Sequence, residues 1–101
     1  MRDTTKWFAG LMEKKLAEND NKEPWEESEI EFLFHRIKEE IQELEDALFD
    51  YVFLSGQVAA DSVKYEAADV ANFAMMIASK VDEIMSKNLR GEKVEGHETG
   101  D

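Results

Sequence analysis

Cysteine is absent from this 101-residue chain, and basic residues are few. The lack of cysteine excludes disulfide bonds and zinc–thiolate sites, which fits an intracellular protein. Only 12 Lys and Arg residues accompany 24 Asp and Glu residues, so the formal net charge is −12. This charge disfavours nucleic-acid polymers and anionic membranes as partners. A small phosphate-bearing ligand remains compatible with it, because a bound metal ion can invert the local field.

The chain also lacks a long apolar run. No segment approaches the ~18 residues that a membrane-spanning helix requires, and residues 1–12 lack the apolar centre of a signal peptide. We therefore expect a cytoplasmic protein with no membrane partner. With 101 residues, the chain is one small domain near the lower size limit for a self-sufficient core.

Residues 66–78 are the most informative segment, because they are apolar apart from Glu66, Asp69 and Asn72. The segment has no Pro or Gly, is rich in Ala and Met, and places a polar residue at every third position, so we predict a helix. A helix that is apolar on nearly all sides must be enclosed by other helices or by a second subunit. The two carboxylates then need a cation, and no Lys or Arg lies between Glu66 and Lys80.

The first of three predicted helices covers about Thr4 to Glu18, with Asp3 or Thr4 as its N-cap. It ends at the turn-forming residues 19–22, and the single proline, Pro24, marks the linker that follows. The predicted inner face of this helix consists of Trp7, Phe8, Leu11, Met12 and Leu16.

The second predicted helix begins at Ser28, which has capping-box spacing to Glu31, and runs to about Phe53. Ser55-Gly56 is the clearest turn, although Asp61-Ser62 could cap a later start of the third helix, which runs to about Asn88. The predicted core stripe of the second helix consists of Phe34, Ile37, Ile41, Leu44 and Leu48.

The chain divides into one helical domain at residues 1–90 and a tail at residues 91–101. The tail is rich in glycine and acidic residues, and Val94 is its only apolar residue, so we expect it to be disordered. The sequence shows no internal repeat and no strand-like alternation, and the predicted fold class is all-α.

Glu40 and Glu43 flank the core stripe of the second helix on the same edge, whereas Glu39 falls nearer the outer face. In an antiparallel hairpin that turns near Ser55, the second and third helices bring Glu43 level with Glu66 and Glu40 level with Asp69. The sequence therefore predicts four carboxylates in one cleft, which is the oxygen-rich environment that Mg²⁺ prefers.

These acidic residues carry a resemblance to a known family. Glu39-Glu40-x-x-Glu43, followed after 22 residues by Glu66-x-x-Asp69, resembles the EExxE…ExxD signature of the all-alpha nucleoside triphosphate pyrophosphohydrolases. This is the MazG-like group related to dimeric dUTPases. The resemblance covers about residues 22–80 and includes the linker at Pro24-Trp25.

The resemblance implies a helical hairpin whose MazG-like four-helix core is completed by a homodimer or a dimer of dimers. It also implies Mg²⁺-dependent hydrolysis of an NTP or dNTP to the monophosphate and pyrophosphate, with Mn²⁺ as a substitute ion. Glu40, Glu43, Glu66 and Asp69 match the family's metal ligands, and Glu39 matches its leading glutamate. Either Glu39 or Glu43 would orient or deprotonate the attacking water.

The candidates for substrate binding are Lys22, Trp25, Arg36, Lys64 and Asn72. The basic residues would contact phosphate oxygens, and Arg36 is the best placed because it stands one turn before Glu40. A salt bridge to a glutamate explains Arg36 equally well. Trp25 could stack on a nucleobase, although a linker tryptophan is more often a core plug. Asn72 could bond a neighbouring helix, touch substrate or order a metal-bound water.

Three other hypotheses compete with this one. A di-iron bundle is rejected, because neither His35 nor His97 follows a glutamate by three residues. A non-catalytic acidic module for dimerisation or regulation would bind a cation only structurally. A pyrophosphohydrolase of the same fold could act on another pyrophosphate compound, such as a nucleotide sugar or a histidine-pathway intermediate. Metal-dependent turnover separates the enzymes from the module.

Overall fold

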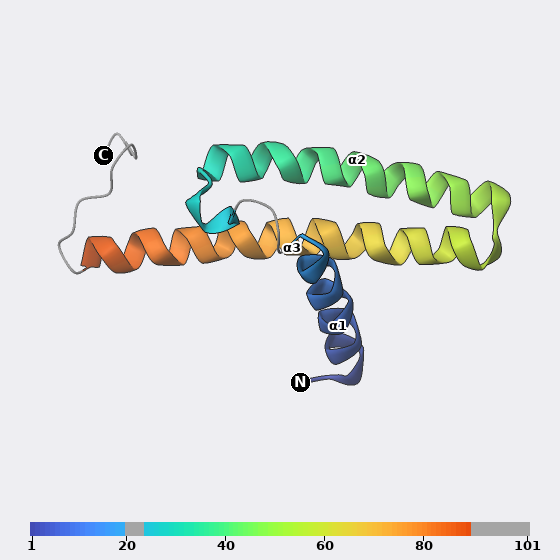
Figure 1. The fold of residues 1–101 in the computed structure, drawn as a ribbon, viewed down its shortest axis with the longest axis horizontal. Helices are drawn as coiled ribbons and strands as arrows, with labels where there is room; N and C mark the ends of the chain where they lie inside the picture. The colour runs from blue at the N-terminus through green and yellow to red at the C-terminus, as the bar shows by residue number, and fades with distance from the viewer. Residues whose placement is uncertain (20–23, 90–101) are drawn as a thin grey trace.

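A computed structural model describes residues 1–19 and 24–89, and within these ranges the regular structure is entirely helical, as the sequence predicted (Figure 1). The elements are α1 (Asp3–Glu18), the short 3₁₀ helix η1 (Trp25–Glu27), α2 (Ile30–Leu54) and α3 (Gly56–Leu89). No helix among them is long and apolar enough to cross a membrane. The predicted tail at residues 91–101 lies outside the described ranges.

A hairpin of α2 and α3 forms the body of the molecule (Figure 1). The two helices are separated by Ser55 alone, and both Ser55 (φ 59°) and Gly56 (φ 91°) have left-handed backbone conformations. Glycine adopts such a conformation readily because it has no Cβ. The predicted turn at Ser55-Gly56 is confirmed, and the alternative later start of the third helix at Asp61-Ser62 is wrong.

Helix α1 packs against the middle of α3 through its C-terminal half, while its N-terminal half projects away from the hairpin (Figure 1). The Asn72 side chain donates a hydrogen bond from Nδ2 to the Met12 carbonyl at 3.1 Å, and Lys14 Nζ donates to the Tyr65 hydroxyl at 3.0 Å. Residues 66–78 are therefore flanked by α2 and by α1. Contacts with these two helices of the same chain cover part of the apolar surface of residues 66–78.

The predicted helix caps differ from those in the structure. The N-cap of α1 is Arg2, and that of α2 is Glu29, and neither uses a side-chain hydrogen bond. Ser28 does not cap α2, because it closes η1 instead: its backbone N–H donates to the Trp25 carbonyl at 2.9 Å.

The face of α2 that packs against α3 is rotated from the predicted core stripe. Leu33, Glu40 and Ala47 are its buried residues. In contrast, the predicted core residues Phe34, Ile41 and Leu48 are 56%, 50% and 45% exposed. The other two residues of the predicted stripe, Ile37 and Leu44, are partly buried, so the prediction holds for them and fails for Phe34, Ile41 and Leu48.

Buried apolar residues are few in the described part of the chain: Leu33, Ala47, Ala68 and Met76. Trp7, which we predicted to face inward, is exposed because it lies on the projecting half of α1. Two long helices and one crossing helix leave much of each helix uncovered. The stability of the single chain therefore depends on a small set of contacts.

We predict that Leu33→Ala lowers the free energy of unfolding by about 2–5 kcal/mol, because Leu33 is 1% exposed and its truncation leaves a cavity. Leu54→Ala is the matched control, since Leu54 belongs to the same helix and is 74% exposed. Its expected cost is below about 1 kcal/mol. Urea denaturation of both variants measures the difference, and equal losses would contradict the packing described for α2.

Candidate metal centre

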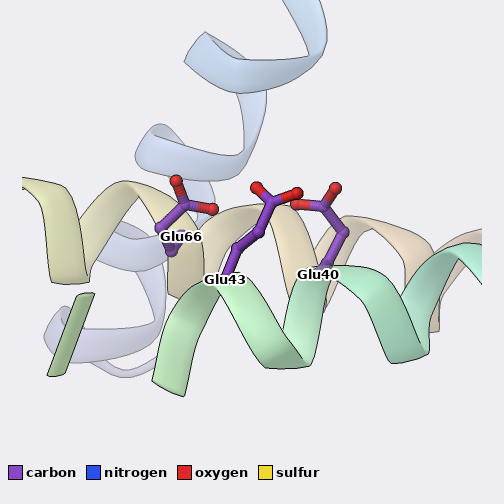
Figure 2. A group of neighbouring side chains, drawn as sticks. All are labelled: Glu40, Glu43 and Glu66. Atoms are coloured by element: carbon purple, nitrogen blue, oxygen red, sulfur yellow. The ribbon is translucent and has the colours of Figure 1, made fainter. Parts of the chain in front are cut away.

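Three carboxylates from the two helices of the hairpin gather at one place. Glu40 and Glu43 project from α2 and Glu66 projects from α3, and one oxygen of each lies within 4.8 Å of the others. Figure 2 shows their carboxyl groups turned to the same side of the hairpin. The predicted pairing of Glu43 with Glu66 across the hairpin is therefore present in the structure.

Local geometry explains why these residues meet. Glu40 and Glu43 are three residues apart on α2, so they share one edge of that helix. The turn at Ser55 fixes the register of α3, which places Glu66 opposite them. The small buried residues Ala47 and Ala68 occupy the inner sides of the two helices.

Nearby basic side chains do not balance the negative charge of the three carboxylates. Glu40 is 5% exposed and is paired with Arg36, whereas Glu43 and Glu66 have no ion pair with a basic side chain in the described ranges. Glu66 Oε1 is buried without a hydrogen-bond donor. Burial raises the pKa of Glu66, and the neighbouring charges of Glu43, Asp69 and Glu40 raise that pKa further. A cation at this position would offset both effects.

Asp69 lies beside this group but makes a different contact. Its Oδ2 is 3.8 Å from Lys15 Nζ on α1, and Lys15 also pairs with Glu18 at 3.0 Å. Burial raises the pKa of Asp69, and the charge of Lys15 opposes that rise. Sequence reasoning missed Lys15, although Lys15 follows Met12 by three residues and so lies on the inward side of α1.

Arg36 and Glu39 form a second ionic group at the edge of the centre. Arg36 Nη2 donates to Glu40 Oε2 at 2.9 Å, and its Nη1 donates to Glu39. Glu39 also pairs with His35 at 3.1 Å, and the Arg36 hydrogen bond lowers the Glu39 pKa. Glu39 is therefore held outside the three-carboxylate group. The Arg36 guanidinium lies 5.0 Å from the centre of the Phe73 ring.

A cavity of about 630 Å³ adjoins the centre, within the usual size range of small-molecule sites. Four of the predicted site residues line it: Trp25, Arg36, Asp69 and Asn72. Lys64 does not line it, and its ammonium group forms an ion pair with Asp61 at 3.7 Å on the exposed surface of α3. Lys22 lies outside the described residues.

The donor set of the centre fits a hard divalent cation. Its ligands are all carboxylate oxygens, which suit Mg²⁺, Mn²⁺ or Ca²⁺ better than softer metals. Two oxygens bound to one Mg²⁺ are at most about 4.2 Å apart. The 4.8 Å limit of this group is slightly wider, so small side-chain adjustments would complete the coordination. The unpaired Glu66 oxygen is available for such a bond.

We predict that Glu66→Gln raises the melting temperature of the metal-free protein at pH 7. The wild-type pKa is raised above 4.5, so ionisation of Glu66 destabilises the folded state as the pH rises through that value. The variant removes this cost, and its advantage should shrink as the pH falls below 4.5 and vanish well below that value, where Glu66 is protonated in both the folded and the unfolded state.

Added Mg²⁺ should stabilise the wild type and stabilise Glu66→Gln less. Thermal unfolding in EDTA and in Mg²⁺ measures both effects. Glu45→Gln is the control, because it removes the same charge from an exposed position of α2. A lower melting temperature for Glu66→Gln than for Glu45→Gln at pH 7 would show that the Glu66 carboxylate is satisfied without a cation.

The arrangement can hold a divalent ion at the carboxylates and an organic group in the cavity beside them. Arg36 and Asp69 lie between the carboxylates and the cavity, since both residues line the cavity and both are close to Glu40. No family model, curated protein or solved structure matches this chain.

Proposed function

We propose that this chain is a cytoplasmic, Mg²⁺-dependent nucleoside triphosphate pyrophosphohydrolase of the MazG-like all-alpha group. The observation that carries the proposal is the group formed by Glu40, Glu43 and Glu66, with a buried carboxylate oxygen that lacks a donor, beside a cavity of nucleotide-compatible size. The EExxE…ExxD pattern of the sequence supports the same reaction.

Glu40, Glu43 and Glu66 would hold the ion. Asp69, which pairs with Lys15, would be a fourth ligand. When bound, the ion would neutralise phosphate charge and make a nearby water more acidic. Glu43 is the most exposed of the three, so its carboxylate is the best placed to orient that water and accept its proton.

Arg36 would bind the phosphate chain. Its guanidinium lines the cavity and stands beside Glu40, so phosphate oxygens between the cavity and the carboxylates lie within its reach. The attacking water adds to phosphorus, and the bridging P–O bond between the α- and β-phosphates breaks. The products are the nucleoside monophosphate and pyrophosphate, and the proton of the water passes to a carboxylate.

The exposed stripe of α2, formed by Phe34, Ile41 and Leu48, would bind a second copy of the chain. These residues are seven positions apart, which is the spacing that two packed helices use along their contact. A copy related by a two-fold axis presents the same stripe, so the contact is self-complementary. The small core of one chain supports a homodimer or a dimer of dimers with a completed bundle.

We predict pyrophosphate release from at least one member of a panel of NTPs and dNTPs with Mg²⁺, and its loss in EDTA. Glu43→Gln and Asp69→Asn should each lower kcat by about 100-fold or more, because each removes a carboxylate at the reacting centre. Glu45→Gln, two residues from Glu43 on the exposed side of α2, should keep wild-type activity.

Full activity of Glu43→Gln would show that the carboxylate centre does not take part in the reaction. If no nucleotide in the panel is cleaved, pyrophosphate compounds without a nucleotide base come next. If these also fail while Mg²⁺ still stabilises the fold, the non-catalytic module takes the place of the enzyme.

We predict that Ile41→Glu lowers the molar mass in solution to that of one chain, whereas the wild type is a dimer or larger at micromolar concentration. A charge on the apolar stripe cannot be buried without a partner. Gln42→Glu is the control, because it adds a charge at the neighbouring exposed position, where it also removes the hydrogen bonds of Gln42 to Glu45 and Asp46. Light scattering measures both, and a monomeric wild type would contradict the self-association.

A further inference from the structure

Asp69 has two possible partners, because it stands between α1 and the three-carboxylate group. At about 100° per residue, Tyr65, Asp69 and Asn72 fall within about 60° of one another on α3. Tyr65 and Asn72 both hydrogen-bond to α1. Glu66, which faces the carboxylates of α2, falls about 60° from Asp69 on the opposite side. Asp69 is therefore at the boundary between the α1 contact and the candidate metal centre.

In this structure Asp69 is paired with α1. Its Oδ2 lies 3.8 Å from Lys15 Nζ, and each of the two side chains is 21% exposed. The carboxyl group of Asp69 does not belong to the three-carboxylate group. The other ion pair of Lys15, with Glu18 at 3.0 Å, lies within α1, and the Glu18 side chain is 52% exposed. The contact with Asp69 is thus an ion pair that joins α1 to α3, and solvent screens it less than the pair with Glu18.

Asp69 is also close enough to the three-carboxylate group to act on it. Burial raises the pKa values of Glu40, Glu66 and Asp69, and neighbouring negative charges raise them further. The charge of Asp69 acts in this way on Glu40 and Glu66, and the charge of Glu43 acts on Asp69. A divalent ion among these groups would attract Asp69 more strongly than one ammonium group does, because it carries twice the charge.

We propose that Lys15 is an internal counterion of Asp69 that a divalent cation displaces, so that metal binding and the docking of α1 compete for one carboxylate. This inference rests on the proposed function, in which Asp69 is the fourth ligand of the ion. In the metal-free protein the Lys15 ammonium compensates Asp69 and ties α1 to α3. With the ion bound, Lys15 keeps its pair with Glu18 and loses its contact with α3. Lys15 is a positioning residue, because it acts on the ion through Asp69.

The first test measures Mn²⁺ binding to the whole chain without nucleotide, from the electron paramagnetic resonance signal of the free ion. Lys15→Gln should bind Mn²⁺ about three- to tenfold more tightly than the wild type, because Asp69 no longer has a competing partner. Lys14→Gln is the matched control, since it removes the same charge at the next position, where Nζ donates to Tyr65 instead. An equal gain in both variants, or no gain in Lys15→Gln, would overturn the inference.

A double-mutant cycle separates displacement from simple repulsion of the ion by Lys15. In an Asp69→Asn background, Lys15→Gln should change the Mn²⁺ affinity by less than about twofold, since the ammonium then has no carboxylate to hold at this position. A gain that persists in this background would show that Lys15 repels the ion directly, and the displacement would be wrong. Lys15→Arg keeps the charge and should retain the wild-type affinity.

The wild type supplies a test that does not depend on the folding of any variant. Lys15 is largely covered while it is paired with Asp69, so its amine should become more accessible when Mg²⁺ binds. Acetylation with a succinimidyl ester, read at each lysine by mass spectrometry, should be severalfold faster at Lys15 in Mg²⁺ than in EDTA. The rate at Lys14 should stay the same. An unchanged rate at Lys15 in saturating Mg²⁺ would overturn the inference.

This inference and the proposed function fail in different ways. The expected response of Mn²⁺ affinity to Lys15→Gln, in a protein that cleaves no nucleotide, would leave this inference standing and remove the proposed hydrolysis. Mg²⁺-dependent cleavage, with the same Mn²⁺ affinity in Lys15→Gln and the wild type, would keep the hydrolase and remove the role of Lys15. Failure of the wild type to bind Mn²⁺ up to about 10 mM would overturn both.

Discussion

The structure is governed by the mutual repulsion of acidic groups held between two packed helices. Glu40, Glu43 and Glu66 meet where α2 and α3 are in contact, and Asp69 adds a further charge nearby. Arg36 and Lys15 each reach one member of this set and leave the others uncompensated. Such an arrangement costs folding free energy unless a cation is bound, so its presence in a chain with a small core favours a role in binding over a role in stability.

Sequence patterns identified the parts of the structure that depend on local information. The turn at Ser55-Gly56, the extents of the three helices and the meeting of Glu43 with Glu66 follow from turn chemistry, helical periodicity and counting back from the turn. The pairing of Asp69 with Lys15 did not follow in this way, because α1 packs across α3 and no local pattern encodes that crossing. The cavity was beyond prediction for the same reason.

The error in the core of α2 has a physical cause. Phe34, Ile41 and Leu48 are large apolar residues, and hydrophobicity alone places them in the core together with Ile37 and Leu44. The most buried residues of α2 are instead Leu33, Glu40 and Ala47, which lie on the neighbouring side of the helix, whereas Ile37 and Leu44 are partly buried. Hydrophobic periodicity shows which positions seek cover, but it does not show which neighbour provides it.

The one-residue connection between α2 and α3 restricts how this chain can vary in length during evolution. An added residue between Ser55 and Glu66 would turn Glu66 by about 100° and shift it by about 1.5 Å along α3. The carboxylates would then point apart. A residue added beyond Met76 would leave their geometry unchanged. Insertions and deletions in related chains should therefore avoid the arm of the hairpin between the turn and the carboxylates, and gather toward the far end of α3.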